Sequence, residues 1–234
     1  MRGLGNYSTF QYNTIKNCYA VNANHDDGFQ SWSTGLDGQV GTGTVIGIIL
    51  RGNTIINYED PNQKFLGDLQ GIGCFDGMFE DWIIENNVIF TNHWHGITLS
   101  GAINCRIVNN TVIDINSEAP GPAWLRISNH KNGTPSRDCL IRNNLTTYIS
   151  TDTGVQIDHN IIISFEDYNN FFKNYSKMDF NLKPNCSAID TGIGDLAPSI
   201  DRDKKDRPAK KGWDIGAYEY RPCNMSPIIL LINM

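Results

Sequence analysis

The sequence predicts an all-β fold in which the chain winds as a parallel β-solenoid, and two features of an internal repeat lead to that prediction. A short segment that opens at an asparagine and continues with apolar residues recurs along the chain, as in Asn87-Val88-Ile89-Phe90. Just before most copies, apolar residues occupy alternate positions, which is the pattern of a half-buried strand. Such a repeat is typical of solenoids with stacked coils. The anchoring residues are Asn13, Asn53, Asn87, Asn110, Asn144 and Asn160.

The spacing of these asparagines divides the chain into about six coils. The steps are 40, 34, 23, 34 and 16 residues, so the 23-residue step is the basic unit and the last coil is shortened. The longer steps carry insertions, at residues 58–69 and 117–122. Asparagine tolerates the left-handed backbone of a tight corner, and stacked Asn amides can hydrogen-bond from coil to coil. We expect coils over residues 1–165, a closing segment over 166–220 and a tail of unknown order over 221–234.

One strand of each coil is expected to present a polar outer column. Aligned on the glycine, these strands read GFQSW, GIGCF, GITLS and, without the glycine, WLRIS. Strand alternation predicts the inward residues, which are Phe29, Ile72, Ile97 and Leu125, followed by Ser31, Cys74, Leu99 and Ile127. The outward residues are then Gln30, Gly73, Thr98 and Arg126, followed by Trp32, Phe75, Ser100 and Ser128. A polar face that offers aromatic side chains is the default binding surface.

The composition argues against several classes of function. With 19 Lys and Arg against 25 Asp and Glu, a net charge of −6 and no basic run, the chain is not suited to nucleic acid. An apolar run at residues 227–232 is too short to span a membrane. The six cysteines show no Cys-x-x-Cys pairing, and we interpret Cys105 and Cys139 as small core residues.

The beginning of the sequence shows neither a signal peptide nor a cap for the solenoid. Residues 1–10 have no apolar core of a signal peptide, and the repeat is already under way at Asn13. A solenoid needs a cap at its open end because exposed strand edges promote aggregation. We therefore expect either the C-terminal part of a longer protein or a partner that covers this end.

The region after residue 165 carries a resemblance to a known family. It reads DFNLKP at 179–184, SAIDTG at 187–192, DRP at 206–208 and DIGAYEY at 214–220. Together with the repeats, this ending resembles the C-terminal segment of secreted bacterial right-handed parallel β-helix proteins of the polysaccharide lyase and pectinase superfamily. The resemblance implies a right-handed parallel β-helix with an irregular closing segment, an extracellular or cell-surface location and a polysaccharide substrate or ligand. Fold alone does not settle the reaction.

The densest ionisable cluster is His25-Asp26-Asp27, at the rim of the outward column. Paired carboxylates beside an imidazole could supply a general acid and a general base, or oxygen ligands for calcium. The alternative is a structural corner in which Asp and Gly satisfy the geometry of a turn.

The second cluster is His93-Trp94-His95, at the equivalent corner of a later coil. A histidine is the usual proton shuttle near neutral pH, and Trp94 could stack on a sugar ring. Zinc is a weak alternative because no further ligand is evident in the sequence. A capped corner with a packed tryptophan is the structural alternative.

Arg126 is the basic residue of the outward column. It could bind a carboxylate or sulfate bidentately, or neutralise a uronate as its α-proton leaves; alternatively, an acidic side chain on the neighbouring coil holds it. The order Asp26/Asp27, Asp76, His95, Arg126 resembles that of pectin-degrading β-helix hydrolases, which use aspartates, a histidine and an arginine on successive coils. Their Asn-Thr-Asp, Asp-Asp and Gly-His-Gly motifs are not matched, so the likeness is one of order.

We therefore predict a carbohydrate-active protein that binds a polysaccharide on the outward face of one parallel sheet and cleaves it as a lyase or a glycoside hydrolase. The alternatives are a non-catalytic glycan-binding or adhesin module, and a spacer whose active part lies upstream. No cofactor is required, although calcium at the aspartate pair is compatible with either function. The predicted reacting groups are Asp26, Asp27, His95 and Arg126, and the predicted substrate-binding residues are His25, Gln30, Trp32, Asp76, His93, Trp94 and Thr98.

Overall fold

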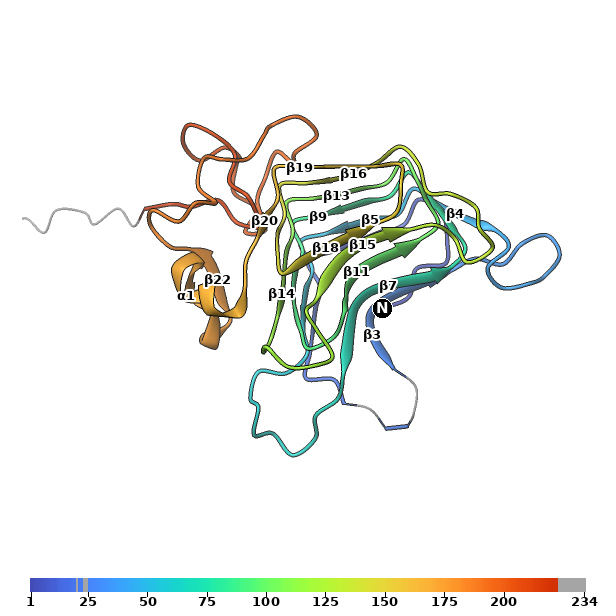
Figure 1. Cartoon of the computed structure of the whole chain (residues 1–234), viewed down its shortest axis with the longest axis horizontal. Helices are drawn as coiled ribbons and strands as arrows, with labels where there is room; N and C mark the ends of the chain where they lie inside the picture. The colour runs from blue at the N-terminus through green and yellow to red at the C-terminus, as the bar shows by residue number, and fades with distance from the viewer. Residues whose placement is uncertain (20, 23–24, 223–234) are drawn as a thin grey trace, which may run out of the picture.

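The structure, a computed structural model, describes residues 1–19, 21–22 and 25–222, and it is an all-β parallel β-helix, as the repeat predicts. Neighbouring strands within each large sheet come from successive coils and run parallel. Figure 1 shows the coils stacked side by side. We name the stacked sheets I to IV in the order in which their first strands occur.

Sheets I and II form two sides of each coil and have six strands each within the described residues. The strands of sheet I are β1 (Thr9–Gln11), β5 (Ile49–Arg51), β9 (Ile83–Glu85), β13 (Arg106–Val108), β16 (Cys139–Arg142) and β19 (Val155–Asp158). The strands of sheet II are β2 (Thr14–Lys16), β6 (Thr54–Ile56), β10 (Val88–Thr91), β14 (Thr111–Asp114), β17 (Leu145–Thr146) and β20 (Ile161–Ile162).

Sheet III contains the longest strands and holds the outward column predicted from the sequence. In spatial order its strands are β18 (Tyr148–Thr151), β15 (Trp124–Ser128), β11 (His95–Ser100), β7 (Leu69–Asp76) and β3 (Asp26–Trp32). Residues 1–3 extend this sheet along β3, where the Gly3 N–H donates to the Gln30 carbonyl at 3.0 Å. The short sheet IV consists of β12 (Ala102–Ile103), β8 (Met78–Glu80) and β4 (Thr44–Ile46).

The corner between sheets I and II is held by a ladder of asparagine side chains. The Oδ1 of the buried Asn110 accepts both the backbone N–H and the Nδ2–H of Asn87 at 2.9 Å, and its Nδ2 donates to Asn144 Oδ1 at 3.0 Å. Asn87 receives the same two bonds from Asn53, which confirms the predicted stacking of amides. The left-handed residue, however, is the one before each ladder asparagine, such as Asn109 with φ 53°. The left-handed corner and the stacked amide, both expected of one asparagine, therefore belong to two neighbouring residues.

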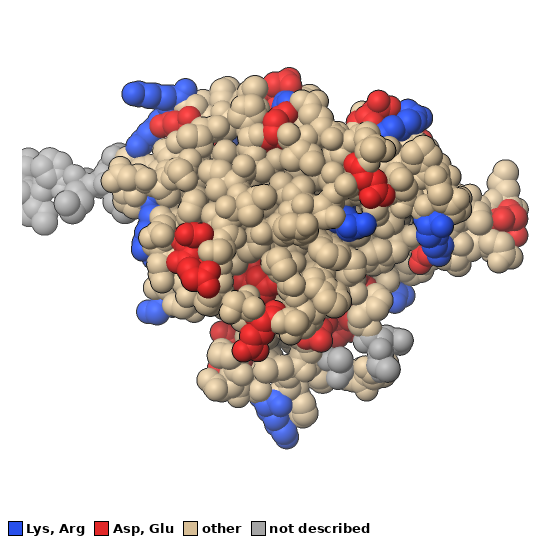
Figure 2. Space-filling view, in the orientation of Figure 1, with Lys and Arg blue, Asp and Glu red and all other residues tan. Residues whose placement is uncertain are grey.

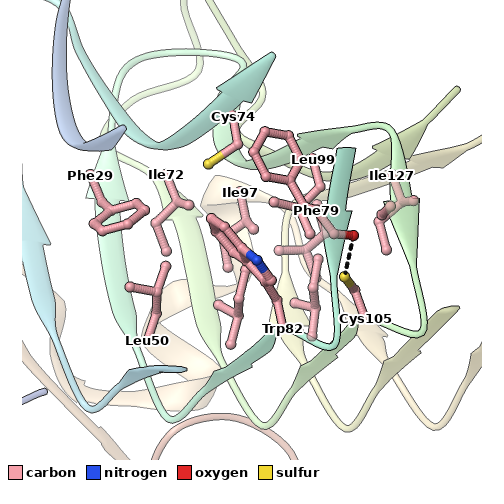
Figure 3. Packing of buried hydrophobic residues seen from close by; sticks show 14 of the residues in the cluster. Phe29, Leu50, Ile72, Cys74, Phe79, Trp82, Ile97, Leu99, Cys105 and Ile127 are labelled. Carbon is pink, nitrogen blue, oxygen red and sulfur yellow. Dashed lines mark hydrogen bonds between the residues drawn. The ribbon is translucent and has the colours of Figure 1, made fainter. Parts of the chain in front are cut away.

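The interior is a column of branched apolar and aromatic side chains. All the predicted inward residues of sheet III are at most 1% exposed. Phe79 and Trp82 fill the centre with ring centroids 5.0 Å apart (Figure 3). The thiol of Cys105 donates to the Phe79 carbonyl at 3.2 Å, the dashed contact in Figure 3. Cys105 and Cys139 are buried and free, which confirms that they are core residues.

Residues 165–220 lie along the outer face of sheet II. Their elements are two 3-10 turns, Phe165–Asp167 and Tyr175–Lys177, the short helix α1 (Tyr168–Phe171) and the hairpin β21 (Phe172–Asn174) and β22 (Asp179–Leu182). Phe90 of sheet II meets Phe180 with ring centroids 5.2 Å apart. Ile157, at an inward position of the last coil, is 46% exposed, so within the described part of the chain the expected closing segment covers a side of the solenoid and leaves that end uncovered. Residues 223–234 of the expected tail lie outside the described residues.

The left-handed asparagines of the corners attach this C-terminal segment to the coils. Asn86 Nδ2 donates to the Ile200 carbonyl at 2.7 Å, and Asn143 Nδ2 donates to the Ile193 carbonyl at the same distance. The repeated Asn-Asn pair thus serves two purposes, because its second member builds the ladder and its first member binds the segment. Among the described residues, no helix has the length and apolarity needed to cross a membrane.

Candidate functional site

Glycines in sheet III are associated with an additional row of side chains on the outer side of the sheet. Gly28, Gly71 and Gly96 each separate a polar residue from the following inward one, and Gly96 is an extra residue relative to β15, because the pairing shifts between His95 and Ile97. A Cβ atom on Gly28 would lie 2.6 Å from a methyl carbon of Ile55, and one on Gly71 would collide with the Gly96 carbonyl oxygen. Bulges of this kind redirect side chains next to binding sites.

Two adjacent rows of outward residues result, each running across the strands. The row before the glycines consists of Asp27, Gln70, His95, Trp124 and Tyr148. The row after them consists of Gln30, Gly73, Thr98, Arg126 and Ser150. The glycine alignment made from the sequence placed Trp124 level with Gly96, which is wrong, because Trp124 pairs with His95.

His95 lies at the centre of these rows. Its Nδ1 is 2.9 Å from Thr98 Oγ1, which also accepts the indole N–H of Trp124 at 2.9 Å. Phe75 and Trp124 place their rings edge-on against the imidazole, with centroids 4.8 and 5.2 Å away. Burial, followed by the nearby charge of His93, lowers the pKa of His95 to about 4. The imidazole is therefore neutral at neutral pH, and Nε2 is the nitrogen left to meet a substrate.

Asp27 occupies the β3 end of the first row. Its Oδ2 is 3.2 Å from His25 Nδ1, and its side chain is only 6% exposed. Burial raises the pKa of Asp27 to about 6, against the lowering effect of His25. Asp27 lines a hollow of about 400 Å³ together with Asp26, His25 and Gln30, so the structure brings these four predicted residues together.

Arg126 is a cation without a counter-ion on this face. Its Nη1 donates to Ser150 Oγ at 2.6 Å, and its guanidinium carbon lies 5.5 Å from the centre of the Trp124 ring. Within the described residues no carboxylate lies at ion-pair distance from it, so the acidic neighbour considered as an alternative is a serine instead. Its remaining N–H groups are available to an anionic ligand.

The predicted aromatic platform is present beside this arginine. Trp94 is 42% exposed, and its ring stacks on Trp124 at 6.4 Å between centroids. Its indole N–H donates at 3.0 Å to the carbonyl of Gly121, in the insertion predicted from the sequence. His93 stacks on His95 at 5.2 Å, and burial lowers its pKa as well.

Two predicted residues lie elsewhere. Trp32 pairs with Asp76 rather than with Phe75, and its ring stacks against the Arg2 guanidinium at 5.2 Å. Asp76 forms an ion pair with Lys131. Both residues stand at the far ends of their strands. The expected register did not include the irregularity between Ser31 and Trp32, which pairs Trp32 with Asp76.

Sequence reasoning also missed site residues. Trp124 and Gln70 were not assigned to the site, although Trp124 pairs with His95 and Gln70 pairs with Asp27 in the first row. For Gln70 the signal was the following glycine, because a polar residue, Gly and a large apolar residue occur in this order in β3, β7 and β11. Trp124 is followed directly by Leu125 and carried no such signal.

Over the described ranges, no group of three or more His, Cys, Asp and Glu side chains is arranged to hold a metal ion. The face drawn in Figure 2 carries scattered acidic and basic groups, some of them side by side, on a mostly uncharged surface. The basic groups on this face do not form the continuous patch that indicates a nucleic-acid partner.

Fold and site together define a class, that of parallel β-helix proteins with a polar and aromatic face on one sheet. No protein-family model matches the chain, and no curated protein sequence matches it either. Among solved structures, it is similar to the crystal structure of pectate lyase Pel9A, with 15% sequence identity, 94% of this chain and 84% of that chain covered, and a TM-score of 0.28. With a TM-score this low, the assignment of the fold rests on the parallel sheets themselves.

Proposed function

We propose that sheet III binds an acidic polysaccharide and cleaves it by β-elimination. The observation that carries this proposal is Arg126, a cation without an acidic partner among the described residues, next to the neutral imidazole of His95. A carboxylate held by a guanidinium makes the neighbouring C–H bond more acidic, and a neutral imidazole can accept the proton.

The two residues have complementary roles in such a reaction. His95 Nε2 removes the proton α to the uronate carboxylate, in the tautomer in which Nδ1–H donates to Thr98. Arg126 stabilises the negative charge that develops on the carboxylate. The electron pair of the broken C–H bond forms a C=C bond, the C–O bond at the β carbon breaks, and the leaving oxygen takes a proton from the new imidazolium or from water. No hydride or electron acceptor is needed.

The remaining residues of the rows suit a polymer that lies along the solenoid axis. The two rows run across the strands from β3 to β18, so a bound chain would meet several coils in succession. Trp94 offers an exposed ring at the side of this path, and Tyr148 is 47% exposed in the first row. Both are suited to stack on the C–H faces of sugar rings. Because such polymers lie outside cells, an extracellular or cell-surface location is part of the proposal.

The test is a digest of a panel of acidic and neutral polysaccharides with Arg126→Ala and a control variant. We expect the wild type to release products that carry an unsaturated uronate, and Arg126→Ala to lose about 100-fold or more in rate. Arg137→Ala is the control, because Arg137 is exposed and paired with Asp138. Full turnover by Arg126→Ala would refute the role of Arg126, and hydrated products would point to a hydrolase that uses Asp26 and Asp27.

One observation favours the alternative, a glycan-binding module without catalysis. Burial lowers the pKa of His95 to about 4, which makes its imidazole a weak base at neutral pH, whereas a general base works best with a pKa near the working pH. A binder would retain affinity for an acidic polymer, lose it in Arg126→Ala, and give no products at any pH. Measuring binding and product release on the same polymer distinguishes the two functions.

A further inference from the structure

The outer face of sheet I carries an arginine whose guanidinium has no partner. Arg106 of β13 stands between Ile83 of β9 and Leu140 of β16, in an outward row that is otherwise apolar at these positions. Within the described residues its side chain forms neither a hydrogen bond nor an ion pair. Only its Nε is shielded from solvent, so the N–H groups on both Nη atoms remain open to a ligand.

Arg106 lines an open hollow of about 340 Å³ together with a second arginine. Arg51 donates from Nε to Glu85 Oε1 at 2.5 Å, and among the described residues its two Nη groups donate to no acceptor. Residues 197–200 form the opposite wall of the hollow. Two guanidiniums against one carboxylate leave a net positive charge, and the free N–H groups of both arginines suit a carboxylate or a sulfate.

The wall of this hollow is fixed to the coils on both sides of Leu196. Asn86 holds the Ile200 carbonyl at 2.7 Å, and Arg142 Nη1 donates to the carbonyl and the carboxylate of Asp195 at 3.1 and 2.8 Å. Between these anchors Leu196 has a left-handed φ of 59° and is 49% exposed. A leucine in this conformation is strained, and residues of this kind cluster at ligand-binding sites.

The hollow continues along the solenoid axis into a second one of about 480 Å³. Arg106 lines both hollows, and the second is also lined by Leu140, Leu196 and Asp81. Together they extend from Arg51 on β5 to Leu140 on β16, and three steps between strands span roughly 14 Å. A single small anion would fill only the first hollow, whereas an extended polymer would occupy both. We call the two hollows the sheet I groove.

We infer that the sheet I groove is a second binding site for an acidic polysaccharide. Arg106 and Arg51 bind the carboxylate or the sulfate group of one sugar, and the C–H face of the next sugar lies against Leu140 and Leu196. The Asp81 carboxylate, which accepts a bond from Asn104 on one oxygen, can accept a sugar hydroxyl on the other. The choice of a sugar polymer rests on the proposed function. Because the reacting groups lie on sheet III, this groove contributes to attachment of the polymer and not to the bond-breaking step.

Arg106→Ala and Leu196→Gly test the groove when each is added to Arg126→Ala, because binding that Arg126→Ala retains then measures sheet I. Calorimetry uses trimers of galacturonate, mannuronate and glucuronate, and a sulfated trimer of galactose. We expect Arg106→Ala to weaken the retained binding about tenfold or more, as for lost hydrogen bonds from a charged group. Leu196→Gly should also weaken it without lowering Tm, since glycine adopts the left-handed conformation freely. Lys173→Ala is the control, because Lys173 is exposed and does not line either hollow.

The trimers also identify the anionic group. Arg106-dependent binding of the uronate trimers alone assigns a carboxylate to the groove, and such binding of the sulfated trimer alone assigns a sulfate ester. Unchanged affinity for every trimer in Arg106→Ala, an equal loss in Lys173→Ala, or no binding of any trimer to Arg126→Ala would overturn the groove as a binding site.

Kinetics separate this inference from the proposed function. On the polymer that the wild type cleaves, Arg106→Ala should raise KM and leave kcat unchanged, whereas Arg126→Ala lowers kcat. If the polymer is cleaved and Arg106→Ala changes neither KM nor the binding of a trimer, the groove is refuted and the elimination reaction stands. If trimers bind in an Arg106-dependent way and no polymer is cleaved, the elimination reaction is refuted and the groove stands.

Discussion

Asp27 and His95 have pKa values that the same physical cause shifts in opposite directions. Burial raises the pKa of Asp27 to about 6 and lowers that of His95 to about 4, because burial disfavours the charged form of either group. At neutral pH His95 has therefore reached its preferred neutral form, whereas Asp27 is a buried carboxylate with one unpartnered oxygen. The site thus retains a destabilising buried charge at Asp27 and a neutral imidazole at His95, and perturbed pKa values of this kind are typical of functional sites.

Asp27→Asn should reveal that destabilising charge as a pH-dependent gain in stability. The folded-state pKa of about 6 lies above the ordinary value of 3.8, so the folded state binds the proton more tightly. Wild-type stability is therefore lost as pH rises from about 4 to about 6, whereas the amide does not titrate. We expect Asp27→Asn to have nearly the wild-type Tm at pH 3.5 and a higher Tm at pH 7.5.

The matched control for this prediction is Asp138→Asn. Asp138 is exposed and, among the described residues, its ion pair is with Arg137 alone, so its replacement should shift Tm little at either pH. A Tm of Asp27→Asn below that of the wild type at pH 7.5 would mean that the contact with His25 outweighs burial of the charge.

At the scale of elements, the asparagine ladder is the device that sets the register of the coils. Each ladder side chain satisfies donors of the preceding coil and donates to the next one, so a register slip between coils would leave several buried groups unpaired. The ladder also tolerates insertions, because the loops leave and rejoin the coils at other corners. This explains why unequal sequence steps still give regular stacking.

Asn110→Ala should be strongly destabilising. It removes the acceptor for two bonds from Asn87 and the donor to Asn144 in a fully buried position. We expect a loss of about 3 kcal/mol in the free energy of unfolding, measured by urea denaturation. Asn13→Ala is the control at the exposed end of the ladder, where the side chain only donates to Asn53, and it should cost less than about 1 kcal/mol. Equal losses for the two variants would contradict a cooperative ladder.

The sequence was sufficient to predict the ladder and the inward column, because both depend on local periodicity. It was not sufficient for the outer face of sheet II. Val88, Ile89 and Phe90 are consecutive apolar residues, and such a run indicates a strand buried on both faces. The covering partner is the segment after residue 165, more than 70 residues away, and no local pattern specifies where it docks. The bulges of sheet III were missed because one extra residue reverses the alternation on which the prediction depended.

At the scale of the whole molecule, the C-terminal segment and the coils form one packed unit. The outer residues of sheet II share a core with the segment, and the list of its buried members is Ile56, Val88, Phe90, Ile113, Leu145, Ile163, Tyr168, Phe172, Phe180, Leu182, Ala188, Ile215 and Ala217. Within this interface Arg207 and Glu219 form an ion pair at 2.7 Å with both side chains fully buried. Arg207 also donates to Asn86 Oδ1 at 3.2 Å and to the Gly216 carbonyl at 2.8 Å, so it joins the segment to a corner of the coils.

Arg207→Ala should therefore destabilise the coils as well as the segment. It leaves the Glu219 carboxylate buried without its cation, and breaking such a pair costs about 3–5 kcal/mol. Loss of docking would expose Val88 and Phe90, so we expect a lower urea midpoint, increased binding of a hydrophobic dye and proteolytic cleavage within residues 165–220. Arg137→Ala again provides the comparison, because its ion pair is exposed and should contribute less than about 1 kcal/mol. If the segment became sensitive to protease while the coils kept their wild-type midpoint, the segment would be an independent unit, and the shared core would not stabilise the β-helix.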